Sequence, residues 1–195
     1  HLRTYIMIGG MPEVVVKWIE TQNYALCQEV QDDIIVSYES DFPKYKHKVD
    51  SELLRHVLHS AALQCGKKFV YSKVGEYKTY AVKQALNLLF QAGILIPITH
   101  TSANGLPLGS EADENKRKVI FLDCGLLLRT LNMAMGDISA ITVQILTANA
   151  SDLANKGAIA EQVAGTELLA YRTPNLRHEI FYWTKEAKNS LAEVD

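Results

Sequence analysis

The sequence predicts an α+β fold that is mainly helical, with a helical N-terminal segment, a winged-helix domain and an incomplete α/β part at the C-terminal end. Three observations predict it. Apolar residues recur with helical spacing in several stretches of the chain. Two short apolar runs around a long polar loop indicate a β-hairpin. The last third returns to a helix, followed by two strand-like runs.

The composition is that of an ordinary globular protein. Hydrophobic residues make up 48% of the 195 residues and charged residues 22%, which excludes a disordered chain. The formal net charge of -2 provides no global attraction to nucleic acid or to a membrane surface. No apolar run reaches the roughly 20 residues that cross a bilayer. We therefore expect a cytoplasmic protein with no membrane partner.

The cysteines and histidines indicate no metal site. Cys27, Cys65 and Cys124 are odd in number, widely spaced and without a CxxC pair, which argues against disulfides and structural zinc. His56 and His59 are three residues apart on a predicted helix, but no HExxH motif or third ligand accompanies them. We expect buried thiols and surface histidines.

Residues 1–48 are expected to form a helical segment. Gly9-Gly10-Met11-Pro12 is a break followed by a helix start, because proline suits the first helical turn. That helix should run to about Thr21. A second helix should cover Tyr24 to Ser40, where apolar residues recur near a 3.6 period, and Asp41-Phe42-Pro43 then ends it.

Residues 49–132 show the element order of a winged-helix domain: a helix, a short strand, a second helix and then a long hairpin. A further helix follows the hairpin. The expected elements are helices over Asp50–Ala62, Tyr77–Gln91 and Asp123–Leu131, and strands over Lys67–Tyr71, Ile94–Thr99 and Lys116–Leu122.

Residues 133–195 are expected to begin an α/β unit and not to complete it. The chain starts at His1 without a methionine and stops on a strand-like alternation, so we expect an internal piece of a longer protein. The expected elements are a partly helical stretch over Met133–Ala148, a helix over Ala158–Tyr171, and strands over Glu179–Trp183 and Leu191–Asp195.

Seven short segments, in one order along nearly the whole chain, carry a family resemblance. They are Tyr5 to Val15, Asp41 to Tyr45, Gly105 to Gly109, Lys118 to Leu127, Lys156 to Val163, Tyr182-Trp183 and Ala192 to Asp195. Together they resemble the C-terminal region of a prokaryotic family of AAA-type P-loop ATPases. Full-length members of that family carry an N-terminal ATPase domain and a C-terminal extension of unknown function.

The resemblance implies an order of ATPase core, helical segment, winged helix and a domain similar to the PD-(D/E)XK nuclease fold. The chain would cover the last three, with the nuclease-like part truncated. ATP and Mg²⁺ are then expected in the missing upstream domain, because no GxxxxGK[ST] motif occurs here. We expect a bacterial, non-catalytic fragment without a cofactor of its own.

The resemblance also implies a partial nuclease-like site formed by Glu161 and Asp195. Such sites hold divalent cations between carboxylates, with a lysine near the attacking water. Glu161 lies on a helix face with small and apolar residues, where an acid needs a partner. The alternative is that Glu161 caps a local hydrogen-bond network or pairs with a basic residue.

The second candidate site is the exposed face of the predicted helix Tyr77–Gln91. Lysines neutralise phosphates, and Gln or Asn side chains can contact base edges. Acidic residues in the wing loop would repel phosphate, so a protein-binding face is the alternative. The candidate nucleic-acid-binding residues are Lys78, Tyr80, Lys83, Gln84 and Asn87.

Three functions remain open from the sequence. The first is a non-catalytic region of an ATP-dependent protein whose winged helix binds DNA or a partner protein. The second is part of a metal-dependent nuclease whose Glu-x-Lys strand lies beyond Asp195. The third is a pure interaction module that docks on a partner protein or on a second copy.

Overall fold

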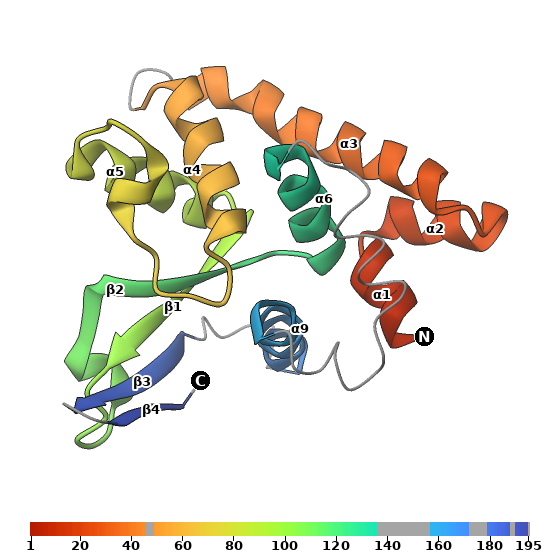
Figure 1. The fold of residues 1–195 in the computed structure, drawn as a ribbon. Coiled ribbons are helices and arrows are strands. Elements are labelled where there is room, and N and C mark those ends of the chain that lie inside the picture. Colours follow the sequence, from red (N-terminus) through yellow and green to blue (C-terminus); the bar gives the residue numbers. More distant parts are fainter. Residues whose placement is uncertain (46–48, 136–156, 172–178, 188–189, 195) are drawn as a thin grey trace.

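The computed structural model describes residues 1–45, 49–135, 157–171, 179–187 and 190–194. Within this part, a group of helices stands on one side of a sheet, and a separate helix lies on its other side (Figure 1). The prediction of a mainly helical α+β fold is confirmed. No helix within the described ranges combines the length and the apolar character that crossing a membrane requires.

The N-terminal segment consists of α1 (Leu2–Ile8), α2 (Pro12–Thr21) and α3 (Tyr24–Asp41), so both predicted helices are confirmed. α2 and α3 pack as a hairpin around a tight link. Gln22 ends α2 in the left-handed conformation with φ 50°. The Asn23 side chain then accepts a hydrogen bond of 2.9 Å from the Ala25 N–H and starts α3.

The predicted helices and hairpin of the central part occur in the expected order, without the short strand between the first two helices. α4 covers Ser51–Leu63, α5 covers Thr79–Gln91, β1 covers Leu95–Thr101, β2 covers Ala112–Phe121 and α6 covers Cys124–Met135. Short 3-10 helices lie between them: η1 (Phe42–Tyr45), η2 (Tyr71–Val74) and η3 (Leu108–Glu111). β1 and β2 pair antiparallel, with Leu95 opposite Phe121.

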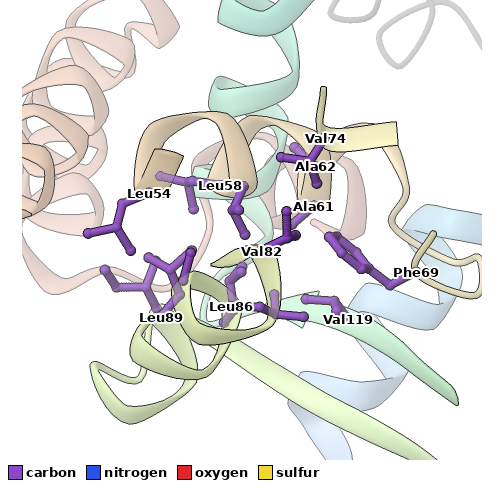
Figure 2. Packing of buried hydrophobic residues seen from close by; sticks show 14 of the residues in the cluster. Leu54, Leu58, Ala61, Ala62, Phe69, Val74, Val82, Leu86, Leu89 and Val119 are labelled. Atoms are coloured by element: carbon purple, nitrogen blue, oxygen red, sulfur yellow. The ribbon is translucent and has the colours of Figure 1, made fainter. Parts of the chain in front are cut away.

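A cluster of buried hydrophobic side chains fills the space between α4, α5 and β2 (Figure 2). Burial of each such side chain stabilises the fold by about 1.5–3 kcal/mol relative to exposure. The buried stripe of α5 directs the opposite, polar stripe of that helix away from the core. The contributing residues include Leu54, Leu58, Val82, Leu86, Leu89 and Val119.

The predicted strand over Lys67–Tyr71 is wrong. The segment makes one isolated bridge, between Lys68 and Lys118, and one hydrogen bond of 2.7 Å from the Phe69 N–H to the Arg117 carbonyl. The Gln64 side chain takes the place of a partner strand, because its Oε1 accepts the Val70 N–H at 2.7 Å. The chain then turns into η2 instead of extending along β2.

The C-terminal part contains α9 (Gly157–Ala170), β3 (Ile180–Ala187) and β4 (Ser190–Val194). β3 pairs parallel to β1, and β4 pairs antiparallel to β3, which gives the strand order β2-β1-β3-β4. The expected α/β unit therefore has no sheet of its own, because its strands extend the sheet of the hairpin. Residues 136–148, expected to be partly helical, lie outside the described residues.

Alternate residues of β2 face opposite sides of the sheet. Val119 and Phe121 join the core beneath α4 and α5. Ile120 faces the other way and packs beside Gly165 of α9, where an added Cβ would lie 2.6 Å from the Ile120 Cδ1. α9 therefore covers the face of β2 that α4 and α5 leave open.

Candidate nucleic-acid interface

The middle of the polar face of α5 contacts β2. Lys83 Nζ donates a hydrogen bond of 2.6 Å to Asn115 Oδ1 and lies 5.4 Å from the centre of the Tyr71 ring. Asn87 Oδ1 accepts a hydrogen bond of 3.1 Å from Arg117 Nη1. These two predicted binding residues are thus held against the outer half of β2, the segment from Ala112 to Arg117.

The start of α5 is the more accessible part of the predicted surface. Lys78 is exposed and occupies the N-cap position rather than the helix body, because α5 begins two residues later than predicted. Tyr80 is 71% exposed, and its hydroxyl accepts a hydrogen bond of 2.9 Å from Gln84 Nε2. Lys78, Tyr80 and Gln84 therefore lie together at the end of α5 that points to solvent.

The segment that joins α4 to α5, residues 64–78, carries most of the free positive charge beside this helix. We call it the basic connection. Glu76 is its one acidic residue. Among the described residues, its four exposed lysines make no ion pair: Lys67, Lys68, Lys73 and Lys78.

The positive charges of the outer half of β2 are paired within the strand. Lys116 Nζ lies 3.6 Å from Asp113, and Arg117 Nη2 lies 3.2 Å from Glu114. A hydrogen bond from the Asn115 backbone N–H lowers the pKa of the Asp113 carboxyl, and Lys116 adds to that effect. Asp113 therefore stays ionised and offsets the charge that this strand could present to phosphate.

Glu161 lies between α9 and the sheet and pairs with a basic residue. Its Oε1 lies 3.0 Å from Lys118 Nζ, and the Lys118 side chain is only 4% exposed. The Lys118 ammonium also lies 5.3 Å from the centre of the Tyr182 ring in β3. Asp195, the other candidate of the nuclease-like site, lies outside the described residues. Within the described ranges, no three His, Cys, Asp or Glu side chains cluster so as to hold a metal ion.

Gln162, next to Glu161, is a structural residue that the sequence analysis missed. Its amide pairs with both backbone groups of Phe121: Oε1 accepts from the N–H and Nε2 donates to the carbonyl, each at 2.7 Å. Cys65 Sγ lies 3.9 Å from the same Oε1, and burial raises the pKa of this thiol to about 12. The sequence did carry a signal for this role, because Gln162 stands among small residues in α9, the helix that packs on the sheet.

The comparison with protein families covers the first two thirds of the molecule. A family model described as Domain of unknown function (DUF8612) matches residues 1–136. The chain belongs to this family. No curated protein and no solved structure matches the chain. The DUF8612 match spans α1 to α6, so it includes the basic connection and α5, while α9, β3 and β4 follow it.

The DUF8612 region holds its first and last helices together through Asp123. This residue caps α6 by accepting the Leu126 N–H at 2.9 Å, and its other oxygen accepts the Gly10 N–H at 2.6 Å. Gly9 has φ 72°, and a Cβ there would collide with the Asp123 carboxylate. The Gly9-Gly10 break is thus a packing feature in which α1 and α6 meet, and not a phosphate-binding loop.

Proposed function

We propose that the chain is the non-catalytic C-terminal region of an ATP-dependent protein, and that its winged helix binds a nucleic-acid duplex. The resemblance of the seven segments supports the first part, with ATP and Mg²⁺ bound by the upstream domain. The observation that carries the second part is the basic connection, whose four exposed lysines lie in the segment that leads into the accessible end of α5.

In this proposal, contacts between lysines and the phosphate backbone of the duplex account for the affinity. Each lysine that neutralises a phosphate releases counterions, so several such contacts give binding that weakens steeply with salt. Lys73 lies in η2 shortly before α5, and Lys78 occupies its N-cap position, so these two suit a duplex backbone that passes the helix N-terminus. Lys67 and Lys68 lie farther along β2, where Lys68 is opposite Lys118. Tyr80 and Gln84 then lie where base edges would be read.

Two alternative functions receive less support. A metal-dependent nuclease needs Glu161 as a metal ligand, whereas this carboxylate lies 3.0 Å from the Lys118 ammonium. A protein-binding wing is compatible with the paired charges of the outer half of β2. It does not account for the lysines of the basic connection, which make no ion pair within the described residues.

The test is a titration of a short DNA duplex with the chain at several salt concentrations. We expect the logarithm of the binding constant to fall linearly with the logarithm of salt concentration. The double variant Lys73→Ala/Lys78→Ala should weaken binding about tenfold and reduce the salt slope by about 2, because each lost phosphate contact removes about one unit.

The matched control is Lys17→Ala/Lys44→Ala, which removes the same charge from α2 and η1, away from the basic connection. This control should bind like the unmodified chain. Binding that is insensitive to salt, or equal losses in the two double variants, would contradict a specific phosphate-contacting face.

A further inference from the structure

A second surface, at the other end of the molecule, combines an open groove with exposed apolar side chains. The groove has a volume of about 540 Å³ and lies between the start of α2, at Met11 and Glu13, and the α3 residues Asp33, Ile34 and Tyr38. Beside the groove residues, the same two helices carry further exposed apolar side chains, namely Val16 at 53%, Ile19 at 68% and Val36 at 57%. We call this surface the α2–α3 groove face.

The outward side of α2 shows how apolar and acidic residues alternate on this face. Glu13, Val16, Ile19 and Glu20 follow one another at spacings that place them on one side of a helix, and all four are exposed. Val14, on the opposite side, is fully buried against α3. The exposed stripe is therefore additional to the one that α2 needs for its own packing.

The charge of this face is strongly negative. Residues 12–41 contain seven acidic residues and one lysine. Asp32 pairs with Arg129, Glu39 with Arg55, and Asp41 with Lys44. Within the described part of the chain the other four make no ion pair, and they are Glu13, Glu20, Glu29 and Asp33.

The basic connection has the complementary composition. It presents four exposed lysines, and apolar side chains lie exposed next to them: Leu63 at 52%, Val70 at 38% and Tyr80 at 71%. α2 and α5 lie at opposite ends of the molecule (Figure 1), so one copy cannot bring its two faces together. The net charge of -2 is small enough that two copies do not repel each other strongly.

We propose that the α2–α3 groove face binds the basic connection of a second copy of this chain, head to tail. Apolar side chains such as Val70 and Tyr80 would enter the groove beside Ile34 and Tyr38, and the lysines would face Glu13 and Asp33. Such a contact uses two different surfaces of the same chain, so it can continue from copy to copy. It also places self-association and duplex binding on one shared surface, the basic connection.

The test is sedimentation of the chain over a range of concentrations, without nucleic acid, so its outcome does not depend on the proposed DNA binding. We expect the average mass to rise with concentration, and the dissociation constant to rise about tenfold between about 50 and 500 mM salt, because exposed charge pairs are screened. A chain that stays monomeric at every concentration and salt overturns the proposal, and would leave the groove to a basic segment of another protein.

Charge reversal identifies the two faces. Asp33→Lys should weaken self-association about tenfold by altering the groove, and Lys78→Glu should do the same by altering the basic connection. Glu167→Lys, an equal change of charge at an exposed position of α9, is the matched control and should have no effect.

Mixing the two variants gives the decisive result. Asp33→Lys copies keep the basic connection, and Lys78→Glu copies keep the groove, so a mixture should associate with at least the affinity of the unmodified contact. A mixture as weak as either variant alone, or self-association that the Glu167→Lys control also weakens, contradicts head-to-tail docking.

Discussion

Each half of β2 contains a lysine that pairs with a carboxylate, but the two pairs lie in different environments. In the outer half, Lys116 is exposed and lies 3.6 Å from Asp113 of the same strand. In the inner half, from Lys118 to Phe121, the Lys118 side chain is 4% exposed and lies 3.0 Å from Glu161 of α9. The run Lys116-Arg117-Lys118 is continuous in the sequence, yet Lys116 is exposed to solvent while Lys118 is buried beneath α9. Neighbouring charges can therefore have unrelated roles.

The difference is one of environment. Water screens the exposed pair, which is expected to contribute at most about 1 kcal/mol. The Lys118–Glu161 pair has lost most of its water, so removing one partner takes a charged neighbour at 3.0 Å from a charge that water screens poorly. The inner half of β2 should accordingly govern whether α9 stays docked, and the exposed Lys116–Asp113 pair should have little influence on stability.

The Cys65 thiol is the most sensitive probe of α9 docking. Burial raises its pKa from 9.0 to about 12, which leaves about a thousandfold less thiolate at neutral pH than in the unfolded chain. We expect alkylation of Cys65 by iodoacetamide at pH 8, followed by peptide mass spectrometry, to be slowed at least that much. Equal rates in the folded and the denatured chain would show that α9 does not cover Cys65.

The raised pKa of Cys65 also makes the free energy of unfolding depend on pH. The folded thiol keeps its proton to higher pH than the unfolded thiol, so its contribution to stability is complete below about pH 9 and is lost as the pH rises through the folded pKa near 12. Cys124, whose pKa burial also raises to about 12, should add to this loss. A free energy of unfolding that does not decrease as the pH rises through this range would argue against both buried thiols.

Replacing Lys118 by methionine should be the most destabilising of the charge changes. The substitution keeps an apolar stem over Tyr182 but leaves the Glu161 carboxylate without its ammonium partner, at a cost of about 3 kcal/mol in denaturant unfolding. The double variant Lys118→Met/Glu161→Leu removes both charges and should recover much of the loss. If the double variant is as unstable as the sum of the single ones, the pair is not the stabilising contact.

Replacing Gln162 by leucine should cost about 2 kcal/mol. The leucine fills a similar volume but leaves the buried N–H and carbonyl of Phe121 without their side-chain partners. In this variant, Cys65 should also alkylate faster, since it lies under the same helix. A stability within experimental error of the unmodified chain would show that water or another group replaces the amide.

Replacing Lys116 by alanine should have the smallest effect, below about 0.5 kcal/mol, because its partner Asp113 is also exposed. Thermal and denaturant unfolding should be nearly unchanged, and Cys65 should stay protected. A loss comparable to that of Lys118→Met would remove the distinction between the two halves of β2.

Local patterns predicted much of the fold. The helical spacing of apolar residues gave α2, α3, α4 and α5 with ends shifted by two residues at most. The Asp50 side chain caps α4 by accepting the Glu52 N–H at 3.1 Å, as its position in the sequence suggested. Such features depend on neighbours a few residues away, which a single sequence displays directly.

Long-range pairing could not be predicted in this way. The parallel contact of Ile98 with Ile180 joins strands from distant parts of the chain, and no residue in either strand identifies its partner. The same limit applies to the site. The apolar face of α9 indicated that Glu161 needs a partner, but only the fold brings Lys118 to it. The sequence shows the lysines of the basic connection, but whether they form ion pairs depends on the surrounding structure.

The Gln162 amide has a consequence for the behaviour of the chain at high concentration. β2 is at the edge of the sheet, and an open edge is a template for β-pairing with another molecule and hence for aggregation. The Phe69 N–H closes this edge at Arg117, and the Gln162 amide closes it at Phe121. Gln162→Leu chains should therefore aggregate through β2 at temperatures where their hydrophobic core is still folded.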